Sequence, residues 1–205
     1  MRVLLQIHAK PPRPGTAKTR LGAAIGHDRA AGLAQAFLRD TLAGARRLAG
    51  ADVVLVTPEP GVDHGVDAER WDQGGGDLGA RLERAFRRGL SGWDLVVALG
   101  GDAPGLPTAH LERLVALGAT GPVLGPADDG GFWGLALQTC PEGALAGVTW
   151  SARTTADEVA SRWPGLVRGP SWWDVDEPAD LDRLRAEVDP ASAPATFAVL
   201  AGWAP

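Results

Sequence analysis

The stretch "DLVVALGGDAPGLP" (residues 94–107) contains the clearest transition from a strand to a loop in this chain. Its apolar run predicts a strand that ends in Gly100, Gly101 and Asp102, so that one carboxylate projects from the end of a sheet. A single carboxylate together with phosphate oxygens is a common way for proteins to hold Mg²⁺. The alternative is that Asp102 only closes the turn made by "GDAPG", as aspartate often does.

Strands and helices alternate on both sides of this stretch. Further strands are predicted at 3–7, 52–58, 68–73, 166–169 and 171–176, with two extended pieces around a polar turn in 122–137. Helices are predicted at 29–48, 78–90, 108–117, 153–163 and 178–188. This alternation is typical of a three-layer α/β/α fold with a mostly parallel central sheet, in which ligands bind at the carboxyl ends of the strands.

Length and composition argue against several classes of protein. The 205 residues suit one α/β domain, which we assign to residues 1–188, followed by an Ala/Pro-rich extension at 189–205. The net charge of -5 argues against a general nucleic-acid binder, because such binding depends on Lys and Arg that neutralise phosphates. No apolar segment approaches the ~20 residues that cross a bilayer, and the first residues do not resemble a signal peptide. We therefore expect a cytoplasmic protein without a membrane partner, whose oligomeric state stays open.

The loop after the first strand, "HAKPPRPGTAKTRLG" (8–22), contains both lysines of the chain. Its prolines fix the backbone before a ligand arrives, and Gly15 allows close approach of a ligand to the backbone. The loop carries four cations and no acid, namely Lys10, Arg13, Lys18 and Arg20. This composition indicates a phosphate-binding loop, although the P-loop pattern G-x-x-x-x-G-K-[ST] is absent. The alternative is a solvated basic loop.

A second acidic motif, "WWDVDEPADL" (172–181), lies near the end of the predicted domain. Asp174 and Asp176 alternate with Val175, so in a strand the two carboxylates share one face and Val175 points into the core. Two carboxylates on one side of a strand end form a second candidate anchor for a metal ion. Either acid can instead be only a helix cap, and Glu177 fits the start of the following helix best.

The glycine-rich segment "QGGGDLGARLERAF" (73–86) precedes a predicted helix. Its glycines, Gly75 and Gly76 among them, expose backbone amides to a base or a phosphate, while Asp77 is placed to cap the helix and Arg81 lies one turn in. A plain turn explains the same residues nearly as well.

Another glycine turn, "GPADDGGFWGL" (125–135), offers a candidate pocket for an acceptor molecule. Its acids and glycines would line the pocket and an aromatic side chain would form one side; these residues are Asp128, Asp129, Gly130, Gly131 and Trp133. The alternative is that Phe132 and Trp133 are core residues beside a hairpin turn. The sequence leaves both interpretations open.

Taken in order, these motifs resemble the nucleotide-diphospho-sugar transferase superfamily, which has the Rossmann-like GT-A fold. The similarity covers residues 1–187 and looks strongest to the bacterial radical-SAM/selenodomain-associated transferases, a family also named as glycosyltransferases, with guanylyl- and cytidylyltransferases as wider relatives. One departure is Glu177, which replaces the threonine usual in the "DVDEPADL" segment.

The resemblance also implies site residues. Lys18 and Arg20 match positions that bind a nucleoside triphosphate, and with Asp102 they are the expected catalytic residues. Asp102, Asp174 and Asp176 match metal ligands, so we expect Mg²⁺ or Mn²⁺. The expected nucleotide-binding residues are Ala9, Lys10, Gly15, Lys18, Arg20, Gly75, Gly76, Asp77 and Arg81.

Two reactions and one non-catalytic role fit these residues. The first is nucleotidyl transfer, in which an NTP and a small phosphorylated or phosphonate acceptor give the NMP-linked acceptor and pyrophosphate. The second is glycosyl transfer from an NDP-sugar to a small acceptor, which needs a base for the acceptor hydroxyl, with Asp128 or Asp129 as candidates. The third is a nucleotide-binding module without catalysis, which the combination of acids and cations makes least favoured.

Overall fold

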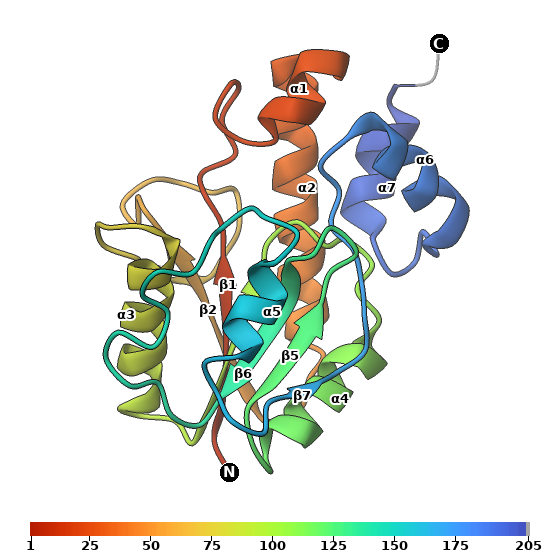
Figure 1. The fold of residues 1–205 in the computed structure, drawn as a ribbon. Helices are drawn as coiled ribbons and strands as arrows, with labels where there is room; N and C mark the ends of the chain where they lie inside the picture. Colours follow the sequence, from red (N-terminus) through yellow and green to blue (C-terminus); the bar gives the residue numbers. More distant parts are fainter. Residues whose placement is uncertain (204–205) are drawn as a thin grey trace.

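A mixed but mostly parallel sheet forms the centre of the protein in a computed structural model that describes residues 1–203 (Figure 1). Within this range the sheet has seven strands in the order β3-β2-β1-β4-β6-β5-β7, with β6 antiparallel to both of its neighbours. The strands are β1 (Val3–His8), β2 (Ala51–Thr57), β3 (Glu69–Asp72), β4 (Leu95–Gly100), β5 (Val123–Pro126), β6 (Phe132–Leu137) and β7 (Val167–Arg168).

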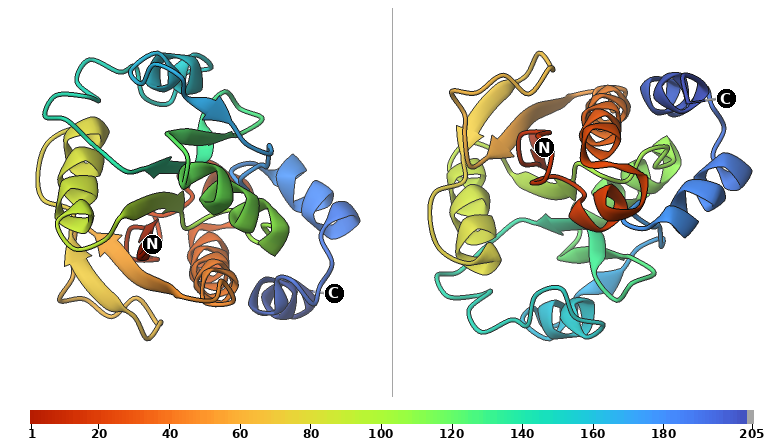
Figure 2. Two further views of the ribbon diagram at one scale, coloured as in Figure 1. Left: turned by 90° about the horizontal axis from the view of Figure 1, so that it is seen from below. Right: turned by 90° about the horizontal axis from the view of Figure 1, so that it is seen from above.

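Helices cover both faces of this sheet, as the views along the strands show (Figure 2). They are α1 (Thr19–Ile25), α2 (His27–Ala45), α3 (Leu78–Leu90), α4 (Thr108–Gly118), α5 (Thr155–Ala160), α6 (Pro178–Glu187) and α7 (Pro194–Ala201). Side chains of α3 and α5 pack with one face of the strands, and side chains of α2 and α4 pack with the other face. The predicted three-layer α/β/α fold is therefore confirmed.

The local sequence explains why α3 begins and packs where it does. Asp77 is its N-cap, and the Asp77 carboxylate accepts a hydrogen bond of 2.8 Å from the backbone amide of Ala80. Leu82, Ala85 and Phe86 recur at helical spacing and are all buried against the sheet. The predicted span of 78–90 matches the helix.

A third apolar cluster lies beyond the carboxyl ends of the strands, where α1, α6 and α7 surround the first half of α2 (Figure 1). Leu33 and Phe37 of α2 are fully buried there. The Asp40 carboxylate on α2 accepts hydrogen bonds from the amides of Ala195 (3.0 Å) and Thr196 (2.8 Å), which begin α7. The part of the C-terminal extension that forms α7 thus packs on α2.

Several predicted elements differ from the structure; the helix predicted at 153–163, for example, spans only Thr155–Ala160 as α5. The long helix predicted at 29–48 spans 27–45, and α1 occupies residues that the sequence assigned to the cationic loop. The strand predicted at 171–176 is absent from the described sheet; only Trp172 forms a single bridge, to Ala127. The amides of Gly169 and Trp172 donate to the carbonyls of Leu124 and Pro126 in β5. The chain then crosses to the residues that follow β4, where the Val175 amide donates to the Asp102 carbonyl.

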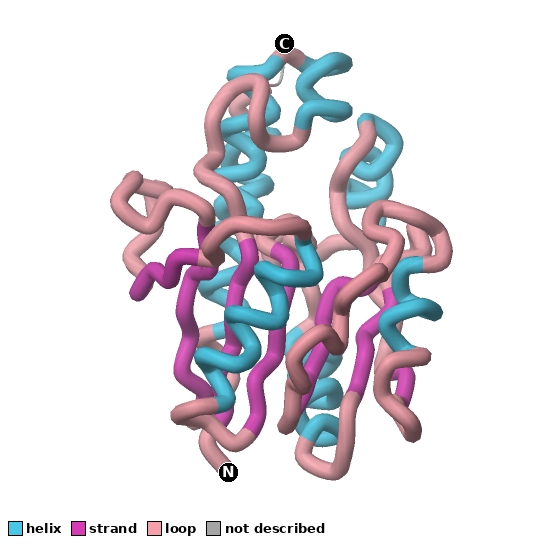
Figure 3. The backbone as a smooth tube through the Cα atoms, turned by 60° about the vertical axis from the view of Figure 1, so that its left-hand side comes forward, coloured by secondary structure: helices cyan, strands magenta, loops and turns pink. Residues whose placement is uncertain are grey.

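The tube drawing shows the strands lying side by side, with loops and helices at both ends of the sheet (Figure 3). The loops that follow β1, β2, β3 and β4 all leave the sheet at one end. That end carries the carboxyl ends of the parallel strands β1 to β4. Of the helices in the described part of the chain, none is long and apolar enough to span a membrane.

Candidate active site at the carboxyl ends of the strands

Asp102 directly follows β4, and two glycines set its position. The Gly101 amide donates to the carbonyl of His8 (3.1 Å), and a side chain on Gly101 would place its Cβ 2.9 Å from the Cβ of Ala9. A Cβ on Gly100 would lie 2.7 Å from the Asp102 carboxylate. Only glycine at both positions therefore lets the ends of β1 and β4 approach while the carboxylate keeps this orientation.

Asp174 and Asp176 reach Asp102 from the loop that precedes α6. The amide of Val175 donates to the carbonyl of Asp102 (3.2 Å), and the Val175 side chain is fully buried in the third apolar cluster. The two flanking carboxylates therefore turn away from that cluster, although the segment is not a strand. The Asp180 carboxylate accepts from the Asp176 amide (2.9 Å), which fixes the backbone at the start of α6.

The three carboxylates form one cluster. One ligand oxygen from each of Asp102, Asp174 and Asp176 lies within 4.8 Å of the others. Burial, followed by the charges of Asp102 and Asp176, raises the pKa of Asp174 to about 6. Crowded carboxylate oxygens are the donor set that Mg²⁺ and Mn²⁺ prefer, so these residues fit a divalent ion.

Lys18 contacts this cluster directly, so the cationic loop, which contains no acid of its own, has acidic partners elsewhere in the chain. Its Nζ lies 2.7 Å from Asp102 Oδ2 and 2.6 Å from Asp176 Oδ1. Burial alone would lower the pKa of Lys18, but the Asp102 and Asp176 carboxylates outweigh burial and raise this pKa above its ordinary value. The Lys18 backbone is left-handed (φ 48°, ψ 51°), an uncommon conformation for a residue with a Cβ.

Two cavities meet at the carboxylates. The loop cavity has a volume of about 560 Å³ and is lined by residues of the cationic loop, including Lys10, Thr16 and Lys18. The turn cavity has a volume of about 390 Å³ and extends toward the turn between β5 and β6. The two cavities share the lining residues His8, Arg20, Leu78, Asp102, Ser151 and Asp176.

The charges differ between these cavities. The loop cavity is lined by the cations of Lys10, Lys18 and Arg20 together with two of the carboxylates. The turn cavity has only Arg20 as a cation, against the four carboxylates of Asp102, Asp129, Asp174 and Asp176. A highly anionic group such as a triphosphate is therefore better matched by the loop cavity.

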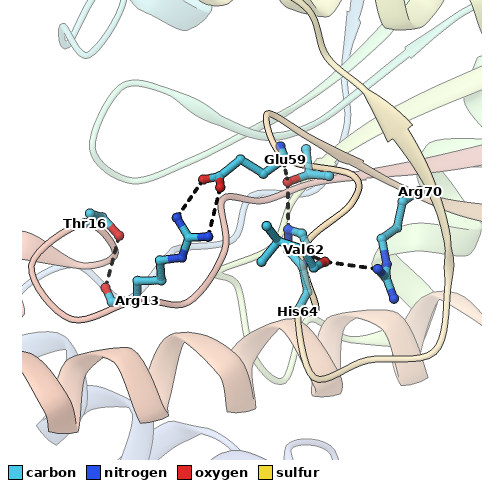
Figure 4. A network of polar contacts seen from close by, with 7 residues as sticks. Arg13, Thr16, Glu59, Val62, His64 and Arg70 are labelled. Carbon is cyan, nitrogen blue, oxygen red and sulfur yellow. Dashed lines mark hydrogen bonds and ion pairs between the residues drawn. The ribbon is translucent and has the colours of Figure 1, made fainter.

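A polar network holds the cationic loop against the loop that follows β2 (Figure 4). Arg13 forms a two-pronged ion pair with Glu59, with N–O distances of 3.0 Å and 2.9 Å. The buried His64 ring contacts the Thr57 hydroxyl (2.7 Å) and the Val62 carbonyl (2.8 Å), which fixes the loop that carries Glu59. Arg13 is thus neutralised, whereas Lys10 and Arg20 form no ion pair within residues 1–203.

Some of the predicted nucleotide-binding residues lie outside the cavity linings. Gly15 occupies an exposed turn with φ 75°. Gly75 and Gly76 lie in the loop immediately before Asp77, the N-cap of α3. Arg81 donates to the carbonyl of Asp77 (3.0 Å). Burial lowers the pKa of His8 to about 4, and the positive charge of Arg81 makes a smaller contribution in the same direction. Arg81 thus affects the site by lowering the pKa of His8 and not by lining a cavity.

Some of the predicted acceptor residues line a cavity, whereas others do not. Asp129, Gly131 and Trp133 line the turn cavity. Asp128 instead pairs with Arg183 of α6 (2.7 Å) and does not line it. Trp133 also belongs to the core and donates its Nε1 hydrogen to the Pro170 carbonyl (2.9 Å), so its place in the core is confirmed, while its contact with an acceptor stays a prediction.

Gly130 explains how the turn between β5 and β6 is held. Its φ is 93°, and a Cβ there would lie 2.3 Å from the Arg153 carbonyl oxygen. The Gly130 carbonyl accepts from the amide of Ala156 in α5 (2.9 Å). This close approach keeps Asp129 and Gly131 at the turn cavity.

His8 and Trp150 also line the turn cavity, although neither is among the site residues expected from the sequence. Within the described residues, His8 Nε2 and Trp150 Nε1 are buried and have no hydrogen-bond partner. His8 is the last residue of β1, and that position at the ligand end of a strand was the available signal. Trp150 precedes Ser151, whose φ of 59° is the second left-handed non-glycine conformation at the site.

Comparison with known proteins agrees with this geometry. Residues 41–152, more than half of the chain, match the family described as "Uncharacterized protein conserved in bacteria (DUF2064)". The chain belongs to this family. A phosphoenolpyruvate guanylyltransferase of Conexibacter woesei is 38% identical over an alignment 189 residues long, and the match covers 82% of this chain and 82% of the relative.

Solved structures show the same fold. A Desulfovibrio desulfuricans protein classed as a nucleotide-diphospho-sugar transferase has a TM-score of 0.82 and 26% identity, with 98% of this chain and 94% of that chain covered. The 2-C-methyl-D-erythritol 4-phosphate cytidylyltransferase of Thermus thermophilus has a TM-score of 0.51 and 20% identity, with coverage of 90% and 96%. The resemblance to the superfamily is therefore confirmed, and the protein is a transferase.

Proposed function

We propose that this transferase is a metal-dependent nucleotidyltransferase that joins an NMP to a small phosphorylated acceptor. An oxygen of the acceptor phosphate attacks the α-phosphorus of an NTP, the bond between the α-phosphorus and the bridging oxygen breaks, and pyrophosphate leaves. The observation that carries the proposal is the cluster of Asp102, Asp174 and Asp176 at the junction of a cationic cavity and a smaller second cavity.

The loop cavity suits the triphosphate. Lys10 and Arg20 are exposed cations without an ion pair in the described chain, so both can bind phosphate oxygens without first breaking a contact. Charge on the leaving pyrophosphate grows during the reaction, and positioned cations stabilise that charge. Arg20 lines both cavities, which places this residue at their junction.

The carboxylate cluster would hold the metal ion. Asp102, Asp174 and Asp176 are its candidate ligands, and the turn cavity beside them would hold the acceptor once the metal ion offsets the charge of these carboxylates. A bound Mg²⁺ or Mn²⁺ supplies positive charge for the oxygens around the reacting phosphorus. An acceptor phosphate is already ionised at neutral pH, so nucleotidyl transfer needs no general base here.

The relatives suggest which substrates to test first. Because the curated relative is a phosphoenolpyruvate guanylyltransferase at 38% identity, we propose GTP and phosphoenolpyruvate as the first pair. The turn cavity of about 390 Å³ has the size for a small acceptor of this kind.

Glycosyl transfer is the second candidate, and one observation favours it. Asp129 lines the turn cavity and its charge contributes to the raised pKa of Asp174, so a carboxylate is available there as a base for an acceptor hydroxyl. Asp128, the other candidate base, is paired with Arg183 outside that cavity.

One assay separates the two reactions. The protein is incubated with Mg²⁺, GTP and phosphoenolpyruvate, and then with the other NTPs and a panel of phosphorylated acceptors, while pyrophosphate is measured. Acceptor-dependent and metal-dependent pyrophosphate release supports nucleotidyl transfer. Release of NDP from an NDP-sugar, with no pyrophosphate from any NTP and acceptor, would overturn it in favour of glycosyl transfer.

A further inference from the structure

The Lys18 ammonium lies among the three carboxylates that are the candidate metal ligands. Its Nζ is within 2.7 Å of Asp102 and 2.6 Å of Asp176. Its side chain is only 8% exposed, whereas the two carboxylates are 40% and 41% exposed. The lysine thus contacts the carboxylates from the protein side, and an ion from solvent would meet the same carboxylates from the other side.

Lys18 is also the counter-ion that the cluster needs. Three carboxylates with oxygens within 4.8 Å repel one another strongly when all are ionised. In the described part of the chain, Lys18 is the only cationic side chain that forms an ion pair with any of them. A divalent ion at the same carboxylates would provide that charge instead, and the two cations would then repel each other.

The loop cavity offers the Lys18 side chain a second position, away from the carboxylates. Lys18 has a left-handed backbone and lies in the cationic loop, immediately before the first residue of α1. Lys18 also lines the loop cavity together with Lys10, Thr16 and Arg20. A side chain that leaves the carboxylates would therefore enter open space beside two other cations.

We propose that Lys18 neutralises the carboxylate cluster in the metal-free protein and leaves Asp102 and Asp176 when a divalent ion binds, turning into the loop cavity. The cation is thereby released for an anionic ligand only after the metal site is filled. This last step rests on the proposed function, which assigns the phosphates to the loop cavity. Because coupling between two sites is reciprocal, an anion bound to Lys18 would in turn strengthen metal binding.

The wild-type protein allows a direct test, because Lys10 and Lys18 are its only lysines. The native protein is acetylated with an N-hydroxysuccinimide ester, with and without saturating Mg²⁺ and without nucleotide, and both lysines are followed by peptide mass spectrometry. Lys10 is exposed and should react at the same rapid rate in both states. Lys18 should react slowly without metal and several-fold faster with Mg²⁺. An unchanged Lys18 rate at saturation would overturn the proposal, since the lysine would then still be held by the carboxylates.

A matched pair of variants gives a second readout. Lys18→Met and Lys10→Met each remove one positive charge that lines the loop cavity, but only Lys18 contacts the carboxylates. Mn²⁺ binding, measured by electron paramagnetic resonance without nucleotide, should tighten markedly in Lys18→Met and only slightly in Lys10→Met. Equal affinities in the two variants would contradict the proposal.

Neither measurement depends on the reaction. If Lys18→Met does not fold without metal, the labelling of the wild-type protein still decides the matter. Metal-dependent exposure of Lys18 in a protein that releases no pyrophosphate would overturn the proposed function and support the displacement of Lys18. Pyrophosphate release with a Lys18 that metal does not expose would overturn only the displacement.

Discussion

The cationic loop and the carboxylate segment form opposite sides of the same site, yet they use their charges differently. In the loop, Arg13 is paired with Glu59 and Lys18 with two aspartates, which leaves Lys10 and Arg20 without an ion pair in residues 1–203. On the opposite side, three carboxylates are crowded together and, among the residues that the structure describes, the Lys18 ammonium alone forms ion pairs with them. The charge that a loop carries in sequence is therefore not the charge that it offers to a ligand.

The largest effect is expected from removing a charge on the acidic side. Asp102→Asn keeps the size of the side chain but weakens both the candidate metal site and the contact with Lys18. We expect transfer to slow by about 100- to 1,000-fold, the usual result of losing one strong electrostatic contact at a reacting centre. Initial rates of product formation at saturating Mg²⁺ measure this change.

Asp128→Asn is the control for that variant, because Asp128 is paired with Arg183 and does not line the turn cavity. It should change the rate by less than about fivefold, as is normal for an exposed ion pair. If the two asparagine variants slowed the reaction equally, the carboxylate cluster would not be the reacting centre.

A smaller effect is expected on the cationic side from Lys18→Ala. Removing one charged hydrogen bond to a phosphate costs about 1.5–3 kcal/mol, so affinity for the NTP should fall by roughly 10- to 100-fold in the presence of Mg²⁺. Affinity for the corresponding NMP should change much less, and calorimetry of both nucleotides gives the comparison. An equal loss for NTP and NMP would show that Lys18 does not face the β- and γ-phosphates.

His8 lies where the two cavities meet and should affect stability through pH. Because burial lowers its pKa to about 4, the folded protein binds fewer protons than the unfolded chain between that pKa and 6.5. Stability should therefore be lost as the pH falls through this window. His8→Gln should lose less stability over the same range, which urea unfolding at about pH 7 and about pH 4.5 can measure. Parallel losses in both proteins would mean that His8 is protonated in the folded state.

The smallest effect is expected from Glu59→Gln, which breaks the ion pair that holds Arg13. Both partners are more than two-fifths exposed, so the pair contributes only about 0–1 kcal/mol to stability. The KM for the NTP should change by less than about fivefold. A much larger rise in KM, without loss of stability, would show that this contact positions the whole cationic loop for the ligand.

Much of the fold followed from local patterns. The apolar runs of β1, β2 and β4 and the capped helix α3 were predicted closely because short buried strands and an Asp N-cap have strong local signals. The structure of the segment around Asp174 was predicted less accurately. Its alternation correctly predicted that Val175 is buried and that its neighbours turn the other way, but not that the segment lies outside the sheet.

The candidate site likewise contains residues that the sequence predicted and contacts that it did not predict. The positions of Asp102, Asp174 and Asp176 at the ends of elements were readable from sequence, as was the loop that carries Lys18. The burial of His8, the pairing of Asp128 with Arg183 and the contact of Arg13 with Glu59 were not readable. Each of these depends on which loops meet in space, and separation along the chain carries no such information.

By itself, the sequence determined the alternation of strands and helices from β1 to α6, apart from α1 and the segment 171–176, together with the residue types at the strand ends and the resemblance to a transferase superfamily. Only the tertiary structure decided that β1 and β4 lie side by side, which brings Lys18 to Asp102, and that Val175 binds the Asp102 backbone, which brings Asp176 to the same ammonium. The physical reason is that local patterns depend on neighbours a few residues apart, whereas the charge left for a ligand depends on ion pairs between distant segments. Those pairs exist only once the sheet has set the order of its strands.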